Sequence, residues 1–581
     1  MNKVLAKILL CAATGSVLTG CLSGNDAPEI APGTALFDNF SYEGKDRFYE
    51  QNPLPDEQSF YTPILPGWYS DPSICTNGKG DYFLVTSTFT YFPGVPIFHS
   101  RDLVNWKQVG HVLSRPSQLV NMEGQHVSGG IFAPAISYNP HNKTYYMVTT
   151  NVGAGNFYVK TQDPFGEWSD PIMLPEVGGI DPSMFFDEDG KAYIVNNDDA
   201  PDFKPEYDGH RTIRVQEFDW KNDKTIGPRK ILVNKGVHPE DKPIWIEGPH
   251  MYKINGKYFL MDAEGGTSVN HSEVIFRSDS PWGPFKAWKN NPILTQRHLD
   301  PNRANPVTCA GHADLIQTTE GDWWSVFLAC RPINNRFENL GRETFLMPVR
   351  WSDDGFPYMT QGDQTIPMIN KRKGVKRADD VTFGNFSVTE EFEDSILGMQ
   401  WMTLRGPATD LYSLTETPGY LTLKCAPKST KEFCVPAFVS RRMQHHEFVA
   451  TTRMYFNPEC ADEKAGILLF KDDFNYEEDD VFYKYKISKK SIVKIKNELL
   501  LDAKSIYEND PASINVKQVI DTYLSFFAIF SYRIAHYLAK NNQKVLARKI
   551  SEYAHSKTSI DIHPEAKIGK SFCIDHGSGI V

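Results

Sequence analysis

The sequence predicts a mainly β protein whose largest part is a five-bladed β-propeller. One strand-like string of aromatic and aliphatic residues occurs five times, and its copies are spaced widely enough to hold about four short strands each, the content of one blade. Aromatic residues, which favour β-structure, make up 13% of the 581 residues. A β-sandwich would also give many strands, but not a fivefold recurrence of this length. The copies are Asp81-Tyr-Phe-Leu-Val85, Thr144-Tyr-Tyr-Met-Val148, Lys191-Ala-Tyr-Ile-Val195, Lys257-Tyr-Phe-Leu-Met261 and Asp322-Trp-Trp-Ser-Val326.

The position ten residues before each string predicts a functional site on the propeller axis. It is occupied by Asp71, Pro134, Asp181, Glu247 and His312. If this position begins the innermost strand, all five residues face the central channel. Asp-Pro-Ser is a common way to open a turn, so each motif taken alone has a structural explanation. Three carboxylates at one phase of the repeat would repel one another, however, and stability gives little reason to gather them.

At these positions the chain resembles glycoside hydrolase family 43, most closely its β-xylosidase-like members. The likeness covers about residues 57–475 and implies a five-bladed propeller followed by a β-sandwich. It also implies inverting hydrolysis of O-glycosidic bonds in xylan- or arabinan-derived oligosaccharides. Of the two activities, xylosidase is the first expectation and arabinofuranosidase the second. The strings that carry it are Pro66-Gly-Trp-Tyr-Ser-Asp71-Pro-Ser-Ile74, Phe92-Pro-Gly-Val-Pro-Ile-Phe-His-Ser-Arg-Asp-Leu-Val-Asn-Trp106, Gly179-Ile-Asp181-Pro-Ser183, Ile246-Glu247-Gly-Pro-His250 and Gly311-His312-Ala-Asp314.

The resemblance assigns roles to individual residues. Asp71 matches the general base, Glu247 the general acid, and Asp181 the third carboxylate, which is expected to raise the pKa of Glu247 by charge repulsion. Arg342 is expected to hold a sugar hydroxyl or a carboxylate, and a structural ion pair is the alternative for it. Further substrate-binding candidates are His312, Phe92, His271 and Phe132, the last of which stands where many relatives carry Trp.

Cofactors and partners follow from the same resemblance and from the charge. No cofactor is expected, and no metal ligand set is assigned. A structural calcium ion in the channel near His312 occurs in the family, but no dense cluster of oxygen ligands demands it here. The expected partner is a xylo- or arabino-oligosaccharide. The net charge of −11 argues against a nucleic-acid partner, which would require a basic face.

The N-terminus predicts export. Lys3 and Lys7 precede a short apolar stretch, and Leu18-Thr-Gly-Cys21 resembles a bacterial lipobox. Residues 1–21 are therefore expected to be a lipoprotein signal peptide and Cys21 the lipidated residue; an ordinary secretory signal with an incidental Cys is the alternative. The expected location is the bacterial cell envelope, periplasm or surface, with the lipid anchor as the one membrane contact. Residues 22–56 are expected to be a linker.

The remaining boundaries come from changes in pattern. Residues 57–378 are assigned to the propeller, and 379–476 to a partial β-sandwich about half as long as in relatives. A helical segment is expected over 477–559. Isoleucines then recur every six residues from Ile562, which predicts the start of a left-handed β-helix over 560–581. The seven cysteines beyond the lipobox show no C-x-x-C pair and are expected to be free buried thiols.

Residues of about 495–581 resemble serine O-acetyltransferase. That resemblance makes His576 the catalytic histidine, with Asp561 and Asp575 as its carboxylates. One rung of the β-helix is too little to bury a solenoid core, so the segment is expected to be a truncated and inactive passenger. A gene fusion or a sequence-assembly artefact, with its junction near 471–495, would account for it. Two functions therefore stand as alternatives to the glycosidase: an acetyltransferase, and a glycan-binding lipoprotein without catalysis.

Overall fold

The computed structural model divides the chain into two compact units, residues 28–481 and residues 482–581. The structure describes residues 28–334, 337–460, 463–472, 476–478, 489–541 and 543–574. The predicted signal peptide and Cys21 lie outside these residues. Within them, no helix is long and apolar enough to cross a membrane.

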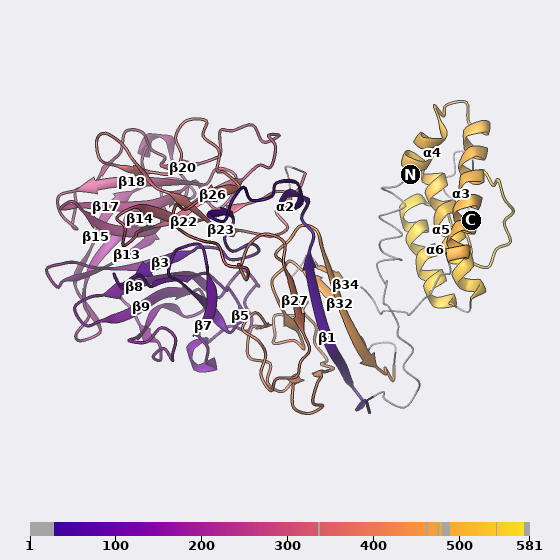
Figure 1. Ribbon diagram of the computed structural model, residues 1–581, viewed down its shortest axis with the longest axis horizontal. Coiled ribbons are helices and arrows are strands. Elements are labelled where there is room, and N and C mark those ends of the chain that lie inside the picture. The colour runs from indigo at the N-terminus through magenta and orange to yellow at the C-terminus, as the bar shows by residue number, and fades with distance from the viewer. Residues whose placement is uncertain are drawn as a thin grey trace. The chain divides into compact units, whose positions relative to one another are not determined.

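The first unit contains the predicted five-bladed propeller (Figure 1). Four blades are antiparallel sheets whose strands follow one another in chain order, and each repeated string forms the second strand of its blade. The strands are β3 (Ser73–Thr76), β4 (Tyr82–Val85), β6 (Gly94–Ser100) and β7 (Lys107–Leu113); β8 (Ile131–Asn139), β9 (Thr144–Asn151), β10 (Gly155–Thr161) and β11 (Ile172–Met173); β12 (Ile180–Phe186), β13 (Ala192–Asp199), β14 (Arg211–Asp219) and β15 (Lys224–Asn234); β16 (Glu247–Ile254), β17 (Lys257–Glu264), β18 (Ser272–Ser278), β19 (Lys286–Ala287) and β20 (Leu294–Thr295).

The fifth blade is completed by a segment from before the first blade. Its own strands are β21 (Thr308–Gln317), β22 (Trp323–Cys330) and β23 (Glu343–Pro348). Leu65 bridges Thr344 of β23, and β2 (Ser59–Tyr61) pairs with β26 (Ile369–Lys371). The ring is thus closed by hydrogen bonds between its two ends, which leaves no free blade edge at that point. The hairpin β24 (Arg350–Trp351) and β25 (Pro357–Tyr358) follows.

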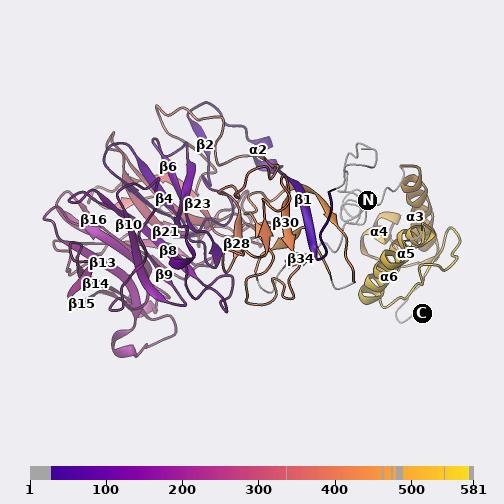
Figure 2. The same cartoon turned by 90° about the horizontal axis from the view of Figure 1, so that it is seen from below.

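The predicted linker over residues 22–56 is wrong for most of its described part. Residues 34–44 form β1 (Thr34–Gly44), which pairs with β27 (Ser387–Glu390), β30 (Leu421–Lys424) and β32 (Phe448–Phe456) in the sandwich. Figure 2 shows β1 beside β30. Ala35 and Phe37 of β1 are buried in one cluster with Trp401 and Leu421, and this burial holds the strand in the sheet. A short helix, α2 (Arg47–Gln51), follows.

The second sheet of the sandwich includes a strand from the propeller. It contains β31 (Val439–Ser440), β28 (Met402–Leu404) and β5 (Tyr91–Phe92), and the last of these leaves blade 1 to pair with β28. The sandwich and the propeller therefore share a sheet. The remaining strands of this part are β29 (Tyr412–Ser413), β33 (Leu468–Phe470) and β34 (Tyr476–Glu478).

The second unit is helical. Its helices are α3 (Lys489–Asn509), α4 (Val516–Thr522), α5 (Leu524–Lys540) and α6 (Lys544–Thr558). Helices α3, α4 and α5 share one apolar core, and α6 packs on α5 in a second, smaller one. Arg533 of α5 forms a buried ion pair with Asp502 of α3. No strand occurs in residues 559–574, so the β-helix stays a prediction without support here. Asp561 lies in this stretch, half-buried; Asp575 and His576 lie outside the described residues.

Candidate active site

In or just before the innermost strand of every blade, a residue at or beside the repeat position identified in the sequence has a left-handed backbone. The backbone φ angle is 53° at Asp71, 53° at Asp181 and 49° at His312; the neighbours Ala133 and Gly248 have φ of 37° and 57°. In four blades the register of the first two strands slips at this point. Such bulges re-aim side chains, and non-glycine residues in this conformation carry strain that is characteristic of functional sites.

These backbone distortions bring the predicted carboxylates to the axis. Asp71, Asp181 and Glu247 are only 5%, 6% and 7% exposed. Asp71, Asp181 and His312 line one small cavity of about 10 Å³, together with residues of four inner strands. A space of this size suits a single water molecule. Of the residues at the predicted repeat position, the structure thus places Asp71, Pro134, Asp181 and His312 around one cavity, whereas Glu247 adjoins it through its neighbour Gly248.

Asp71 is surrounded by donors. Its Oδ1 accepts a hydrogen bond from Nη1 of Arg342 at 2.9 Å, and its Oδ2 accepts from Ser87 Oγ at 2.6 Å and Ser70 Oγ at 2.9 Å. Burial acts to raise the pKa of Asp71, but Arg342, His312 and the two serines outweigh it and lower the pKa below its ordinary value. Asp71 is therefore ionised at neutral pH.

The pKa values of Asp181 and Glu247 are shifted in the opposite direction, upward. Burial and the charge of Asp71 raise the pKa of Asp181 to about 7, although the Gly248 N–H donates to its Oδ2 at 3.2 Å. Burial raises the pKa of Glu247 well above its ordinary value, and repulsion from Asp181 adds to this. Asp181 thus acts on Glu247 in the predicted direction, but desolvation is the larger cause.

Two predicted histidines lie beside the carboxylates. His312 Nδ1 is 3.8 Å from Asp71 Oδ1, and His271 Nδ1 is 2.9 Å from the carbonyl oxygen of Cys309. Burial lowers the pKa of both histidines to about 4, so both are neutral at pH 7. A side chain at Gly248 would meet the His312 ring at 3.0 Å, and one at Gly311 would meet the His271 ring at 2.7 Å. The two glycines therefore make room for the imidazoles.

Aromatic rings form a wall next to Arg342. The guanidinium of Arg342 lies 5.7 Å from the centre of the Phe89 ring. Phe89 stacks on Trp68 with centroids 4.4 Å apart and meets the predicted Phe132 edge-to-face at 5.7 Å. Such faces suit the apolar side of a sugar ring. Trp68 and Phe89 were not singled out by the sequence, although Trp68 stands three residues before Asp71.

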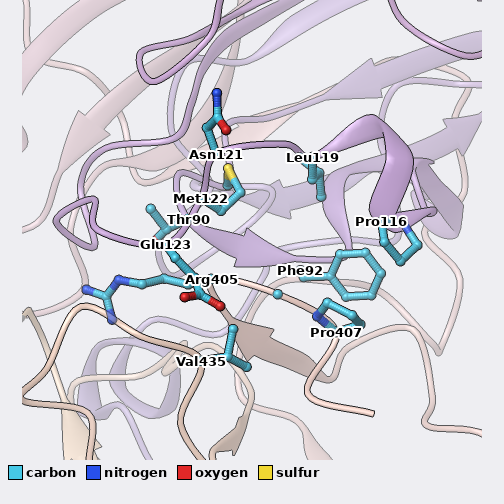
Figure 3. A pocket seen from close by; sticks show the side chains of 11 residues that line it. Thr90, Phe92, Pro116, Leu119, Asn121, Met122, Glu123, Arg405, Pro407 and Val435 are labelled. Carbon is cyan, nitrogen blue, oxygen red and sulfur yellow. The ribbon is translucent and has the colours of Figure 1, made fainter.

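Phe92 does not join this cluster. It pairs with Thr403 of the sandwich and lines a separate cavity of about 330 Å³ between the propeller loops and the sandwich (Figure 3). Leu119, Arg405 and Pro407 line the same cavity. The expected sugar contact at Phe92 is therefore not supported, because pairing with β28 places it away from the axis.

Three further polar residues support the carboxylates and carried no local signal in the sequence. Besides Ser70 and Ser87, Arg211 of β14 lowers the pKa values of both Asp181 and Glu247, against the burial that raises them. Two bonds to Asn197 Oδ1, at 3.0 and 2.7 Å, hold Arg211, and its guanidinium lies 4.7 Å from the Trp245 ring. Only the folding of β14 beside β13 brings this cation near the axis.

A propeller that buries one ionised carboxylate and two carboxyls of raised pKa on its axis has the site of a glycoside hydrolase. Residues 60–357 match the glycosyl hydrolases family 43, and residues 389–526 match the β-xylosidase C-terminal concanavalin A-like domain. The chain belongs to glycosyl hydrolase family 43, and it is a glycosidase. The second match runs past the last described strand through α3 and α4.

Relatives with assigned activities cover most of the chain. A xylosidase/arabinosidase of Butyrivibrio fibrisolvens is 37% identical over 83% of this chain and 90% of its own length. A non-reducing end α-L-arabinofuranosidase of Bacteroides ovatus is 38% identical over 72% of this chain and 75% of its own. Among solved structures, a GH43_12 protein from a capybara gut metagenome is 44% identical, with a TM-score of 0.71 and coverage of 77% of this chain and 82% of that one.

Proposed function

We propose that this protein is an exo-acting glycosidase that releases xylose or arabinofuranose from xylan- or arabinan-derived oligosaccharides with inversion at the anomeric carbon. The observation that carries the proposal is that two carboxyl groups in one site have pKa values shifted in opposite directions. The pKa of Asp71 is lowered and the pKa of Glu247 is raised. Hydrolysis by inversion needs one carboxylate and one carboxylic acid at the same pH. The xylosidase and arabinofuranosidase relatives support the substrate class.

Asp71 is the proposed general base. A carboxylate offers about four acceptor positions, and Arg342, Ser87 and Ser70 occupy three of them. One position on Oδ1 remains to accept a proton from water. Because its pKa is depressed, Asp71 stays ionised and keeps that water oriented toward the anomeric carbon.

Glu247 is the proposed general acid. Its raised pKa keeps the proton that the departing oxygen needs, and the proton leaves as the glycosidic bond breaks. Asp181 is proposed to act through Glu247, because its negative charge opposes ionisation of the neighbouring acid. Asp71 and Glu247 begin blades 1 and 4, which lie nearly across the channel, and this arrangement suits the wide carboxyl separation that inversion requires.

The substrate pocket is proposed to combine the aromatic wall with the cation. The half-buried Trp68 and Phe132 would contact the apolar face of the sugar, with the buried Phe89 packed behind them. Arg342 would contact a hydroxyl while it holds Asp71. The neutral His312 and His271 would accept or donate single hydrogen bonds at the channel floor. No part of this arrangement requires a cofactor, and the structural calcium ion that occurs in the family plays no part in the proposed step.

Assays of aryl β-D-xylopyranosides and aryl α-L-arabinofuranosides, followed by proton NMR of the first-formed sugar, test the proposal. The expected result is release of one or both sugars with the inverted anomer appearing first. Wild-type protein that binds these oligosaccharides and cleaves none would favour the non-catalytic alternative, and a retained anomer would overturn the role of Asp71. The isosteric Asp71→Asn variant, which lacks the proposed base and should be inactive on every aryl glycoside, is the matched control for contaminating glycosidases.

The cellular location is proposed from the N-terminal sequence alone: an envelope lipoprotein anchored through acylated Cys21. Labelled palmitate should enter the wild-type protein and be absent from a Cys21→Ala variant expressed in the same bacterium. Label in the variant, or an unlabelled wild type, would exclude the anchor. The acetyltransferase resemblance of residues 495–581 gains no support from the described residues, and we propose no activity for it.

A further inference from the structure

We infer that blade 5 contains a binding site for a thiophilic divalent cation, best matched by zinc, formed by Cys309, Cys330 and Glu338. One ligand atom from each residue lies within 4.8 Å of the other two. Cys309 and Cys330 are buried, and Glu338 is half-buried. The inference is independent of the proposed substrate, since it concerns residues that take no part in the hydrolysis.

The topology of the blade, rather than a sequence motif, brings the ligands together. Cys309 belongs to β21 and Cys330 to its antiparallel neighbour β22, where Thr308 is the direct partner of Cys330. Cys309 has a left-handed φ of 56°, at a point where the register of the two strands slips. The slip turns the Cys309 side chain toward Cys330 and Glu338, whereas regular pairing would alternate the faces.

The donor set indicates which cation fits. The Sγ atom of Cys309 is 3.2 Å from Oε1 of Glu338. Tetrahedral zinc with bonds of about 2.3 Å to sulfur and 2.0–2.2 Å to oxygen would hold these two atoms about 3.6 Å apart, so a small movement brings this pair to ligand spacing; the three side chains leave the fourth position for water. Two thiolates exclude calcium and magnesium, and the carboxylate favours zinc over monovalent copper. A disulfide between the two cysteines would leave the adjacent carboxylate without a role.

The site is connected to the catalytic residues on two sides. The carbonyl oxygen of Cys309 is bonded to His271, and Cys309 precedes His312 by three residues on the same strand. Glu338 precedes Arg342 by four residues in the segment between β22 and β23. A bound cation would therefore fasten together the strand of His312 and the segment that carries Arg342.

Cobalt binding to the reduced full-length protein tests the site, because thiolate ligands give cobalt(II) an intense near-ultraviolet charge-transfer band. We expect one cobalt ion per chain with this band, and loss of the band when zinc displaces it. Cys330→Ser should reduce the band intensity to about half, because one thiolate remains. Glu338→Gln, a milder change at a half-buried residue, should retain the band but weaken cobalt affinity by at least about tenfold.

The matched control is Cys425→Ser, which removes an exposed thiol of the sandwich that lies near Cys460. It should leave the band unchanged. A band that is weakened in Cys425→Ser and unchanged in Cys330→Ser would overturn the site. The proposal also fails if saturating cobalt gives the reduced wild type no charge-transfer band. It fails equally if mass spectrometry finds the native chain lighter by two hydrogen atoms, with Cys309 and Cys330 joined as a disulfide. None of these readouts depends on glycosidase activity.

Discussion

Nη1 of Arg342 donates a hydrogen bond to Oδ1 of Asp71 over 2.9 Å, and this contact joins the two ends of the propeller ring. Asp71 stands just before the first strand of blade 1, and Arg342 just before the last strand of blade 5. Two roles were considered for Arg342: a structural ion pair, and binding of a carboxylate in the site. The contact with Asp71 is both at once. Closing the ring also sets the charge state of the proposed base.

Removing the Arg342 guanidinium should raise the pKa of Asp71. Arg342→Met is expected to move the acid limb of the kcat/KM profile to higher pH, since Asp71 would be protonated at pH values where the wild type is ionised. Arg342→Lys keeps the charge and should move that limb less. Profiles with an unchanged acid limb in both variants would show that Arg342 does not set the ionisation of the essential base.

The roles of Asp71 and Glu247 can be separated by the leaving group. Asp71→Ala should lower kcat by about 10²–10⁴-fold on every aryl glycoside, because water activation is lost in all cases. Glu247→Ala should show a similar loss only with poor leaving groups, since a nitrophenolate departs without a proton. Measurement of kcat across a series of substituted phenyl glycosides checks this. Equal losses for Glu247→Ala along the whole series would contradict its assignment as the acid.

Asp181 should affect the alkaline side of the profile. Its charge raises the pKa of Glu247, so Asp181→Asn is expected to lower that pKa and shift the alkaline limb of kcat/KM to lower pH. The acid limb reports on Asp71 instead. The pKa of Asp71 is set mainly by Arg342 and by the donors that bind its carboxylate, so Asp181→Asn should move this limb less. An alkaline limb that stays in place would show that burial alone keeps Glu247 protonated.

The buried pair Arg331–Glu343 should be important for stability. Nε of Arg331 is 2.7 Å from Oε2 of Glu343, and the carboxylate also accepts from the Gly67 N–H at 2.9 Å. Arg331→Met leaves that charge buried and unpaired, and is expected to lower the free energy of unfolding by about 3–5 kcal/mol. Adding Glu343→Gln removes the charge but keeps an acceptor for Gly67, so the double variant should recover part of the loss. Denaturant unfolding measures both, and strict additivity of the two changes would rule out the coupling.

Strand β1 should be essential to the sandwich. A chain that starts at Lys45 lacks the partner of β30 and β32 and exposes the apolar residues that pack on Ala35 and Phe37. We expect it to aggregate or to lose the cooperative unfolding of the sandwich, whereas a chain that starts at Pro28 should behave as the wild type. Size-exclusion chromatography with thermal unfolding compares the two. If the two chains are equally soluble and unfold alike, residues 34–44 are not needed by the sandwich and act as a linker.

The sequence alone determined the repeat and the positions proposed to be catalytic, because both are periodic. The second strand of each blade is a short buried string, and a fixed offset from that string leads to the axis in every blade. Asp71, Asp181, Glu247 and His312 could therefore be found without knowing the pairing of a single strand. The direction of the Glu247 pKa shift also followed, since carboxyls gathered in one site must repel.

Tertiary structure alone decided where non-periodic segments pair. Phe37 of β1 meets Leu421 and Met454, and Phe92 meets Thr403, across hundreds of residues of chain. Local sequence pattern holds no information on such partners. For this reason β1 was expected to be part of a linker, and Phe92 was expected to contact the sugar. The same applies to Arg211, Ser87 and the pair Cys309–Cys330, whose roles arise from neighbours on adjacent strands. Side-chain chemistry marked what the site needs, whereas long-range strand pairing determined which residues provide it.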